Sequence, residues 1–87
     1  MTETWNLLIQ AARAAEKRDP GFSEGCLRQA LRSAELFCGV ESAEAGLCLM
    51  ELSDFLERAG RQEEADELSA RYCAILTNYA KSLGISA

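Results

Sequence analysis

The sequence predicts an all-α protein, a single domain of residues 1–87 in which four helices form two antiparallel helical hairpins. Ala, Leu, Glu and Arg, which favour helices, dominate the chain, and no stretch alternates apolar and polar residues as a half-buried strand does. Apolar residues recur three or four positions apart, and turn residues interrupt that pattern at three places. Connections of only a few residues require consecutive helices to run antiparallel.

The first helix is expected over residues 4–18. Its apolar residues keep helical spacing, namely Trp5, Leu8, Ile9 and Ala12. We expect a turn at residues 19–21, because Pro20 fixes φ and Gly21 permits positive φ.

The second helix is expected over residues 23–38, with Ser23 as its N-cap and Gly39 as its stop. One face carries the apolar residues that a core would need. They are Leu27, Ala30, Leu31, Ala34 and Cys38.

The third and fourth helices are expected over residues 42–59 and 62–83. Ser42 is the predicted N-cap of the third, and Gly60 its left-handed stop. The third apolar stripe is Ala45, Cys48, Leu49, Leu52, Leu56 and Ala59. Glu63 and Glu64 lie in the first turn of the fourth helix, where negative charge interacts favourably with the helix dipole. Gly84 is expected to end this helix. Its stripe predicts that both tyrosines lie in the core, and comprises Ala65, Leu68, Tyr72, Ile75, Leu76, Tyr79 and Leu83.

Charge limits the partners. The net charge is -5 and the nine Lys and Arg residues are scattered among acids, so we expect neither nucleic acid nor an anionic membrane to bind. No apolar run approaches the ~20 residues of a membrane span. The first residues lack the basic region of a secretory signal, so a cytoplasmic location is expected.

The sequence predicts no catalytic residue, no cofactor and no metal site. Histidine, the commonest general base, is absent, and the paired acids are explained as solvated helix faces. The four cysteines include no Cys-x-x-Cys pair of the kind that zinc sites use, and we expect reduced structural thiols. A redox or metal role for them is a distant alternative. The thiols are Cys26, Cys38, Cys48 and Cys73.

One segment follows a recognisable hairpin pattern, with an apolar stripe, a small residue, a glycine stop and an alanine in the returning helix. It comprises Leu49, Leu52, Ser53, Leu56, Gly60 and Ala65. In this pattern the chain resembles the tetratricopeptide repeat family. The spacing of Ala30-Leu31, Gly39 and Leu52-Ser53 is similar to that of the kinesin light chain type of repeat, with units of about 42 rather than about 34 residues. Projected backwards, that period carries Ala65 onto Ser23 and Ser53 onto Ala11. The resemblance then covers nearly the whole chain as two repeats, and implies a right-handed αα superhelix.

The resemblance also implies a binding surface, because tetratricopeptide arrays generally bind peptides or helices on the concave face lined by the first helix of each repeat. Carried onto this chain, that face consists of Trp5, Leu8, Leu47, Met50, Asp54, Glu57 and Arg58, with Ala12 and Glu16 beside them. An apolar floor and an acidic rim favour a peptide or partner helix with basic flanks. The alternative is that Leu47 and Met50 only pack against the first helix.

Two functions therefore stay open at this point. The first is a non-catalytic adaptor or scaffold that binds a protein or peptide partner. The second is a self-associating helical bundle whose role is homo-oligomeric assembly. Repeat arrays need about three units or capping helices for stability, so the face around Tyr72 and Tyr79 needs a cover. A homodimer, an obligatory partner protein or the last helix acting as its own cap would each supply one.

Overall fold

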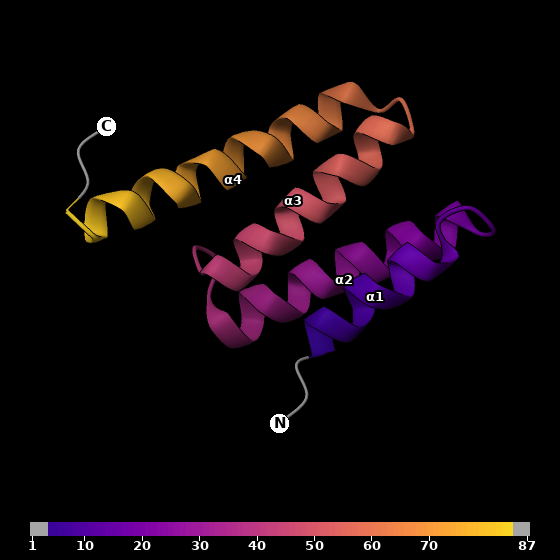
Figure 1. The fold of residues 1–87 in the computed structure, drawn as a ribbon, viewed down its shortest axis with the longest axis horizontal. Helices are drawn as coiled ribbons and strands as arrows, with labels where there is room; N and C mark the ends of the chain where they lie inside the picture. Colours follow the sequence, from indigo (N-terminus) through magenta and orange to yellow (C-terminus); the bar gives the residue numbers. More distant parts are fainter. Residues whose placement is uncertain (1–3, 85–87) are drawn as a thin grey trace.

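Four α-helices account for most of residues 4–84, the part of the chain that the computed structural model describes (Figure 1). The helices are α1 (Thr4–Ala15), α2 (Pro20–Cys38), α3 (Ala43–Arg58) and α4 (Gln62–Ser82). No strand occurs within the described residues. The predicted class and the number of helices are therefore confirmed, whereas residues 1–3 and 85–87 of the predicted domain lie outside the described part.

The boundary between α1 and α2 differs from the prediction. Helix α1 ends at Ala15 rather than near residue 18, and the amides of Arg18 and Asp19 donate to the Ala15 carbonyl as the chain turns. Helix α2 starts at Pro20 rather than at residue 23, because the Asp19 side chain accepts a hydrogen bond from the Phe22 amide at 3.1 Å. Proline suits a first helical position, where no intrahelical bond needs its missing N–H. Ser23 is therefore not the N-cap.

The other helix ends agree with the prediction to within a residue. Ser42 caps α3, and its hydroxyl oxygen accepts a hydrogen bond from the Ala45 amide at 3.0 Å. After α3, Gly60 has φ of 80°, a conformation that glycine adopts without the steric cost of a Cβ. The Arg61 amide then donates to the Leu56 carbonyl at 2.9 Å, which closes the helix in a Schellman arrangement.

The helices pair as two hairpins. Helix α1 packs along α2, and α3 packs along α4, while contact between α2 and α3 joins the hairpins (Figure 1). Helix α3 touches α1 at only a few places. The resulting slab measures 44 × 34 × 16 Å, and α3 lies at its centre with the largest fully buried side chains, Leu49, Leu52 and Leu56.

A buried serine marks the crossing point in each hairpin. The hydroxyl of Ser23, on α2, donates to the Ala12 carbonyl on α1 at 2.8 Å. The hydroxyl of Ser53, on α3, lies 3.0 Å from the Ala65 carbonyl on α4. Ser23 and Ala65 are 42 positions apart, and Ala12 and Ser53 are 41 apart. The two hairpins therefore close at nearly corresponding positions, with the serine on opposite helices.

The core agrees with most of the predicted stripes. Helix α3 contributes one buried residue outside its stripe, Phe55, and exposes one within it, Ala59. On α2, Cys26 is buried and Cys38 is exposed, which reverses the expectation for the stripe. On α4 only two residues of the stripe, Ala65 and Ile75, are buried, because α3 covers only part of the length of α4. Tyr72 packs partly against the core, but Tyr79 is 57 % exposed, so its predicted core position is wrong.

Candidate protein-interaction surface

Two ion pairs join α1 and the residue that follows it, Glu16, to α3. Arg13 pairs with Glu51, and Arg58 donates to both carboxylate oxygens of Glu16, at 2.7 and 2.8 Å. Because successive helices alternate in direction, α1 and α3 run the same way, as Figure 1 shows. We call the side of α1 and α3 that carries the seven predicted binding residues the α1/α3 surface. These residues are Trp5, Leu8, Leu47, Met50, Asp54, Glu57 and Arg58.

The apolar members of the α1/α3 surface are half-buried. Trp5, Leu8 and Leu47 pack against the core, and Met50 is also only partly exposed. Trp5 and Leu47 are 42 positions apart, as are Leu8 and Met50, so each helix supplies the same two positions. Each side chain therefore packs inward with part of its surface and meets solvent with the rest.

Ala12 does not belong to the accessible surface. Ala12 is 1 % exposed, and its carbonyl accepts the hydrogen bond from Ser23 at the crossing of α1 and α2. The expectation that Ala12 contributes to binding is therefore wrong, since a residue at a helix crossing has no free surface.

The polar members differ in how they are engaged. Asp54 and Glu57 are exposed, whereas Arg58 forms an ion pair with Glu16. The hydrogen bond from Arg58 lowers the pKa of Glu16, and the same bond raises the pKa of Arg58. Sequence reasoning named both residues but missed the pair. The available signal was that opposite charges stand 42 positions apart, the length of the suspected repeat.

A second set of ion pairs joins α4 and the residue that precedes it, Arg61, to α2. Glu24 accepts a hydrogen bond from Arg61 at 2.6 Å, which lowers the pKa of Glu24. The other pairs across the two helices are Arg28 with Glu64 and Arg71 with Glu35. Ion pairs between the hairpins thus link α1 to α3 and α2 to α4, at separations of 36 to 42 positions.

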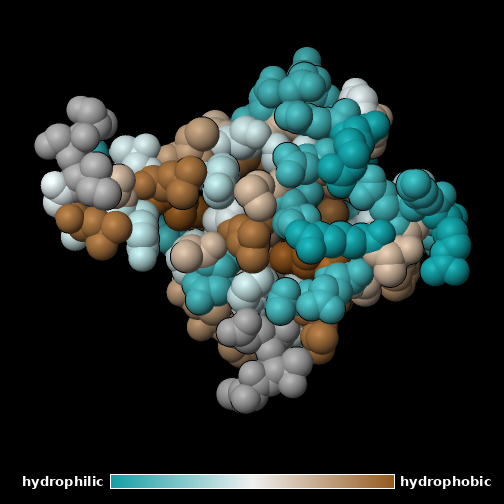
Figure 2. Space-filling model, in the orientation of Figure 1, coloured by the Kyte–Doolittle hydropathy of each residue, from teal (hydrophilic) through white to brown (hydrophobic). Residues whose placement is uncertain are grey.

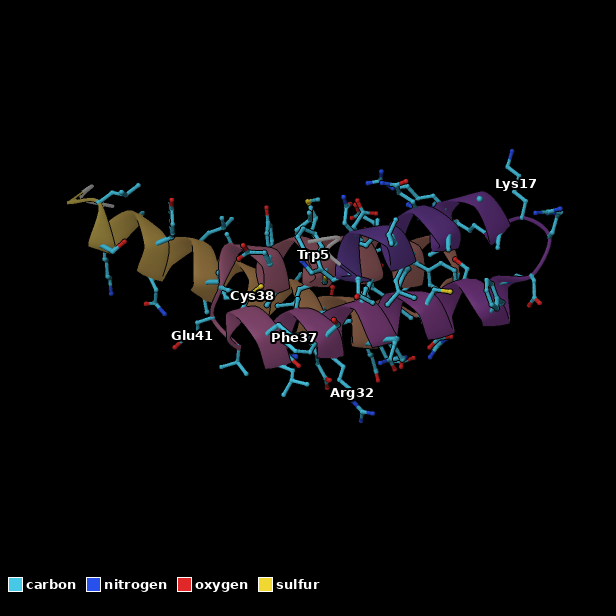
Figure 3. The ribbon with its side chains drawn as sticks, turned by 90° about the horizontal axis from the view of Figure 1, so that it is seen from below. Trp5, Lys17, Arg32, Phe37, Cys38 and Glu41 are labelled. Atoms are coloured by element: carbon cyan, nitrogen blue, oxygen red, sulfur yellow. The ribbon has the colours of Figure 1, made fainter. Side chains whose placement is uncertain are left out.

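Charge and hydrophobicity separate along the molecule. Figure 2 shows hydrophilic side chains gathered over the half that holds the α1–α2 and α3–α4 turns, and hydrophobic ones exposed toward the C-terminal end of α4. Lys17 lies at the charged end, Trp5 and Phe37 lie near the middle, and Glu41 lies toward the other end (Figure 3).

The cysteines divide into two classes. Cys26 and Cys48 are buried, and Cys38 and Cys73 are exposed. Burial raises the pKa of the Cys48 thiol to about 12, so this thiol is protonated at neutral pH and is a poor nucleophile. Across the described residues, no group of three or more Cys, Asp or Glu side chains is placed to hold a metal ion.

No family model, curated protein or solved structure matches this chain. Within residues 4–84, no helix has the length and apolar character needed to cross a membrane.

Proposed function

We propose that this chain is a non-catalytic protein–protein interaction module, an adaptor or scaffold of the cytoplasm, with a tetratricopeptide-like architecture. The observation that carries the architecture is the register of the two hairpins. Glu16 and Arg58, which pair directly, are 42 positions apart, and so are Ser23 and Ala65, which take part in the buried serine contacts of the two hairpins. Equivalent helices of successive units lie beside one another in a stacked repeat.

The proposed binding site is the α1/α3 surface, formed by the first helix of each hairpin. Its partly exposed apolar side chains offer contact area that is already held in place by packing against the core. Asp54 and Glu57, both exposed, stand beside that area and favour a partner with positive charge. The partner that fits is a peptide or helix with apolar side chains on one face and Lys or Arg at its flanks.

The test uses Trp5, the only tryptophan of the chain, as a probe within the proposed site. Helical peptides with basic flanks are selected from a displayed library against the full chain, and a selected peptide is titrated while Trp5 fluorescence and binding heat are followed. We expect Leu47→Asp and Met50→Asp to weaken binding about tenfold or more, because each places a carboxylate in an apolar contact.

Leu7→Asp is the matched control, because Leu7 is exposed on α1 and lies away from the buried Ile9 and Ala12. Circular dichroism establishes that each variant keeps its helical content. Binding that is unchanged in folded Leu47→Asp and Met50→Asp, or equally weakened in Leu7→Asp, would refute the α1/α3 surface as the site.

A further inference from the structure

Side chains of α2 and α4 meet across α3. Helix α3 runs between α2 and α4, and within the described chain the backbones of α2 and α4 do not come into contact (Figure 1). Polar side chains instead bridge the two helices, including the turn after α2 and the residue before α4. We call these bridges the α2/α4 ladder, which comprises the pairs Arg61–Glu24, Arg28–Glu64, Arg71–Glu35 and Asn78–Glu41.

The first part of the α2/α4 ladder is a closed ring of four charged side chains. Arg61 donates to Glu24 at 2.6 Å and to the two carboxylate oxygens of Glu64 at 2.6 and 2.9 Å. Arg28 donates to Glu24 at 2.9 Å and to Glu64 at 3.4 Å. The hydrogen bonds from Arg61 lower the pKa of both carboxyl groups. Each charge of the ring thus has two opposite charges beside it, and such a network holds its geometry better than an isolated surface pair.

The α2/α4 ladder fits one register of the two helices. The pairs Arg28–Glu64 and Glu35–Arg71 are seven positions apart on both helices, and the order of the charges is reversed between them. A shift of α4 by seven positions would place Arg71 opposite Arg28 in one direction, or Glu64 opposite Glu35 in the other. Like charges would meet in either case, so the ladder opposes sliding of one hairpin along the other.

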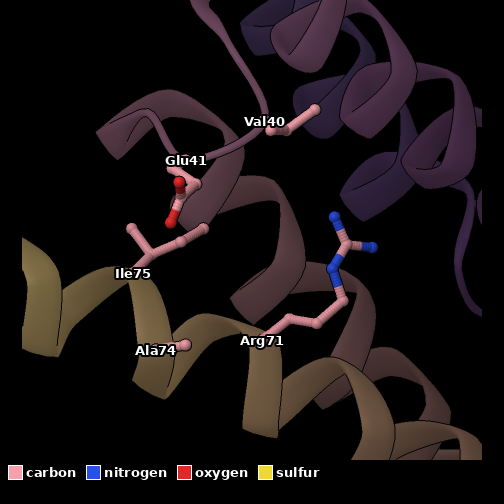
Figure 4. A pocket seen from close by; sticks show the side chains of 5 residues that line it. All are labelled: Val40, Glu41, Arg71, Ala74 and Ile75. Atoms are coloured by element: carbon pink, nitrogen blue, oxygen red, sulfur yellow. The ribbon is translucent and has the colours of Figure 1, made fainter.

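The ladder crosses a space that is not filled by packed side chains. Arg71 and Glu41, which belong to successive bridges, line a pocket of about 200 Å³ between α4 and the α2–α3 turn (Figure 4). Val40, Ala74 and Ile75 complete the lining of this pocket. The open space leaves α4 room to move relative to the end of α2.

The first helices of the two hairpins are also joined mainly by side chains. Figure 3 shows α1 (indigo) and α2 (purple) on opposite sides of the slab. Helix α3 touches α1 at only a few places, where the pairs Arg13–Glu51 and Arg58–Glu16 bridge the hairpins. The extensive contact between the hairpins is that of α2 with α3. Packed helices tolerate a spread of about 15–20° in their crossing angle, so the bridges on the two sides select the angle within that range.

We propose that the α2/α4 ladder is a latch that sets the angle between the two hairpins and, through this angle, the spacing of α1 and α3. When the ladder opens, the hairpins pivot about the contact of α2 with α3, and the apolar side chains that α1 and α3 contribute to the α1/α3 surface change their separation. This second step rests on the proposed function, because it concerns the affinity of the α1/α3 surface for its partner. A partner that fits one spacing of α1 and α3 favours one state of the ladder in return.

The separation of α2 and α4 is the first measurement. Spin labels are placed on Cys38 and Cys73, two exposed thiols that lie on α2 and α4. In Arg61→Met combined with Arg71→Met, which removes one member of the ring and the next bridge, the mean distance between the labels should lengthen by a few ångström and its distribution should broaden. High sodium chloride should have the same effect on the unaltered chain, because it screens the ion pairs without a substitution.

The matched control is Arg18→Met combined with Arg32→Met, which removes the same charge. Both side chains are exposed, neither pairs with another side chain of the described residues, and Arg32 points away from the helices (Figure 3). The control should leave the distance between the labels unchanged. A distance that neither the ladder variant nor salt changes, or that the control changes equally, would overturn the latch.

Peptide affinity then tests the coupling to the α1/α3 surface. A peptide selected for that surface should bind the ladder variant about fivefold or more weakly than the control variant, which has the same net charge. A longer distance with equal peptide affinity in both variants would refute the coupling. The distance measurement uses no peptide, so a chain whose α1/α3 surface binds nothing refutes the proposed function and still reports whether the ladder is a latch.

Discussion

The two hairpins differ most at positions that correspond under the 42-residue offset. Four positions of α3 that are buried against the neighbouring helices have counterparts on α1 that face solvent. The buried residues are Leu49, Leu52, Phe55 and Leu56, and their exposed counterparts are Leu7, Gln10, Arg13 and Ala14. On another face Ile9, Ala12 and Ala15 are buried, and their counterparts are the partly buried Glu51 and the exposed Asp54 and Glu57.

This difference shows that each of these two helices is apolar where a neighbouring helix covers it and largely polar where nothing in the described chain does. A polar residue on an uncovered face gives up no buried apolar area, and it improves solubility. Large apolar residues are nevertheless exposed on α1, α2 and α4. Ala34 of α2 is buried, whereas its counterpart on α4, Leu76, is a larger apolar residue and is 49 % exposed. At this position of α4 an uncovered helix face therefore stays apolar.

The comparison of the two hairpins predicts the largest change in stability at Leu52, and almost none at its counterpart Gln10. Leu52→Ala should lower the free energy of unfolding by about 2–5 kcal/mol, because it leaves a cavity in a fully buried site. Gln10→Ala, at the corresponding exposed position of α1, should change it by less than about 0.5 kcal/mol. Urea unfolding followed by circular dichroism measures both. Similar losses for the two variants would show that the hairpins are not related by this offset.

A smaller loss of stability is expected at the crossing of α3 and α4. Ala65→Leu should lower the free energy of unfolding by about 1–3 kcal/mol, since Ala65 is fully buried and its carbonyl is bonded to Ser53. Ala70→Leu is the control, because Ala70 is exposed on the same helix and takes the same substitution. Thermal unfolding that shows no loss for Ala65→Leu would remove this residue from the close contact of the two helices.

The smallest effect concerns the ion pair between the hairpins. A double-mutant cycle with Glu16→Gln and Arg58→Met should give a coupling of about 0.2–1 kcal/mol, as is usual for partly exposed pairs. Zero coupling at low ionic strength would mean that the pair does not hold the hairpins in register.

The same pair predicts a pH dependence. Because Arg58 lowers the pKa of Glu16 in the folded state, its stabilisation is present above the usual Glu value of 4.5 and is lost as the pH falls below it. Unfolding midpoints measured between neutral pH and pH values below 4.5 should fall less steeply for Glu16→Gln than for the unaltered chain. An equally steep fall would place the acid sensitivity in other carboxylates.

The sequence was sufficient to predict the helices because their signals are local. Ser42 and Gly60 act within one turn of the residues that they cap or stop, so their roles could be read without tertiary information. The start of α2 was misplaced because Asp19 and Pro20 also form a common turn, and only the fold shows that the helix begins there.

The candidate site was less predictable, because its members depend on which helix covers which. The stripe of α4 runs unbroken from Ala65 to Leu83, and periodicity alone does not show where α3 stops covering it. Tyr79 was therefore placed in the core. The pairing of Arg58 with Glu16 likewise depends on how the two hairpins stack. The spacing of residues within one helix does not predict that stacking.

The buried thiol of Cys48 has a consequence for following motion in this protein. Cys48 lies in the central helix and is 1 % exposed, whereas Cys73 on α4 is exposed. A thiol reagent should modify Cys73 at once, and Cys48 only as often as the structure around α3 opens. The rate at which Cys48 is labelled would thus report the free energy of that opening in the native protein, with Cys73 as an internal reference for reagent reactivity.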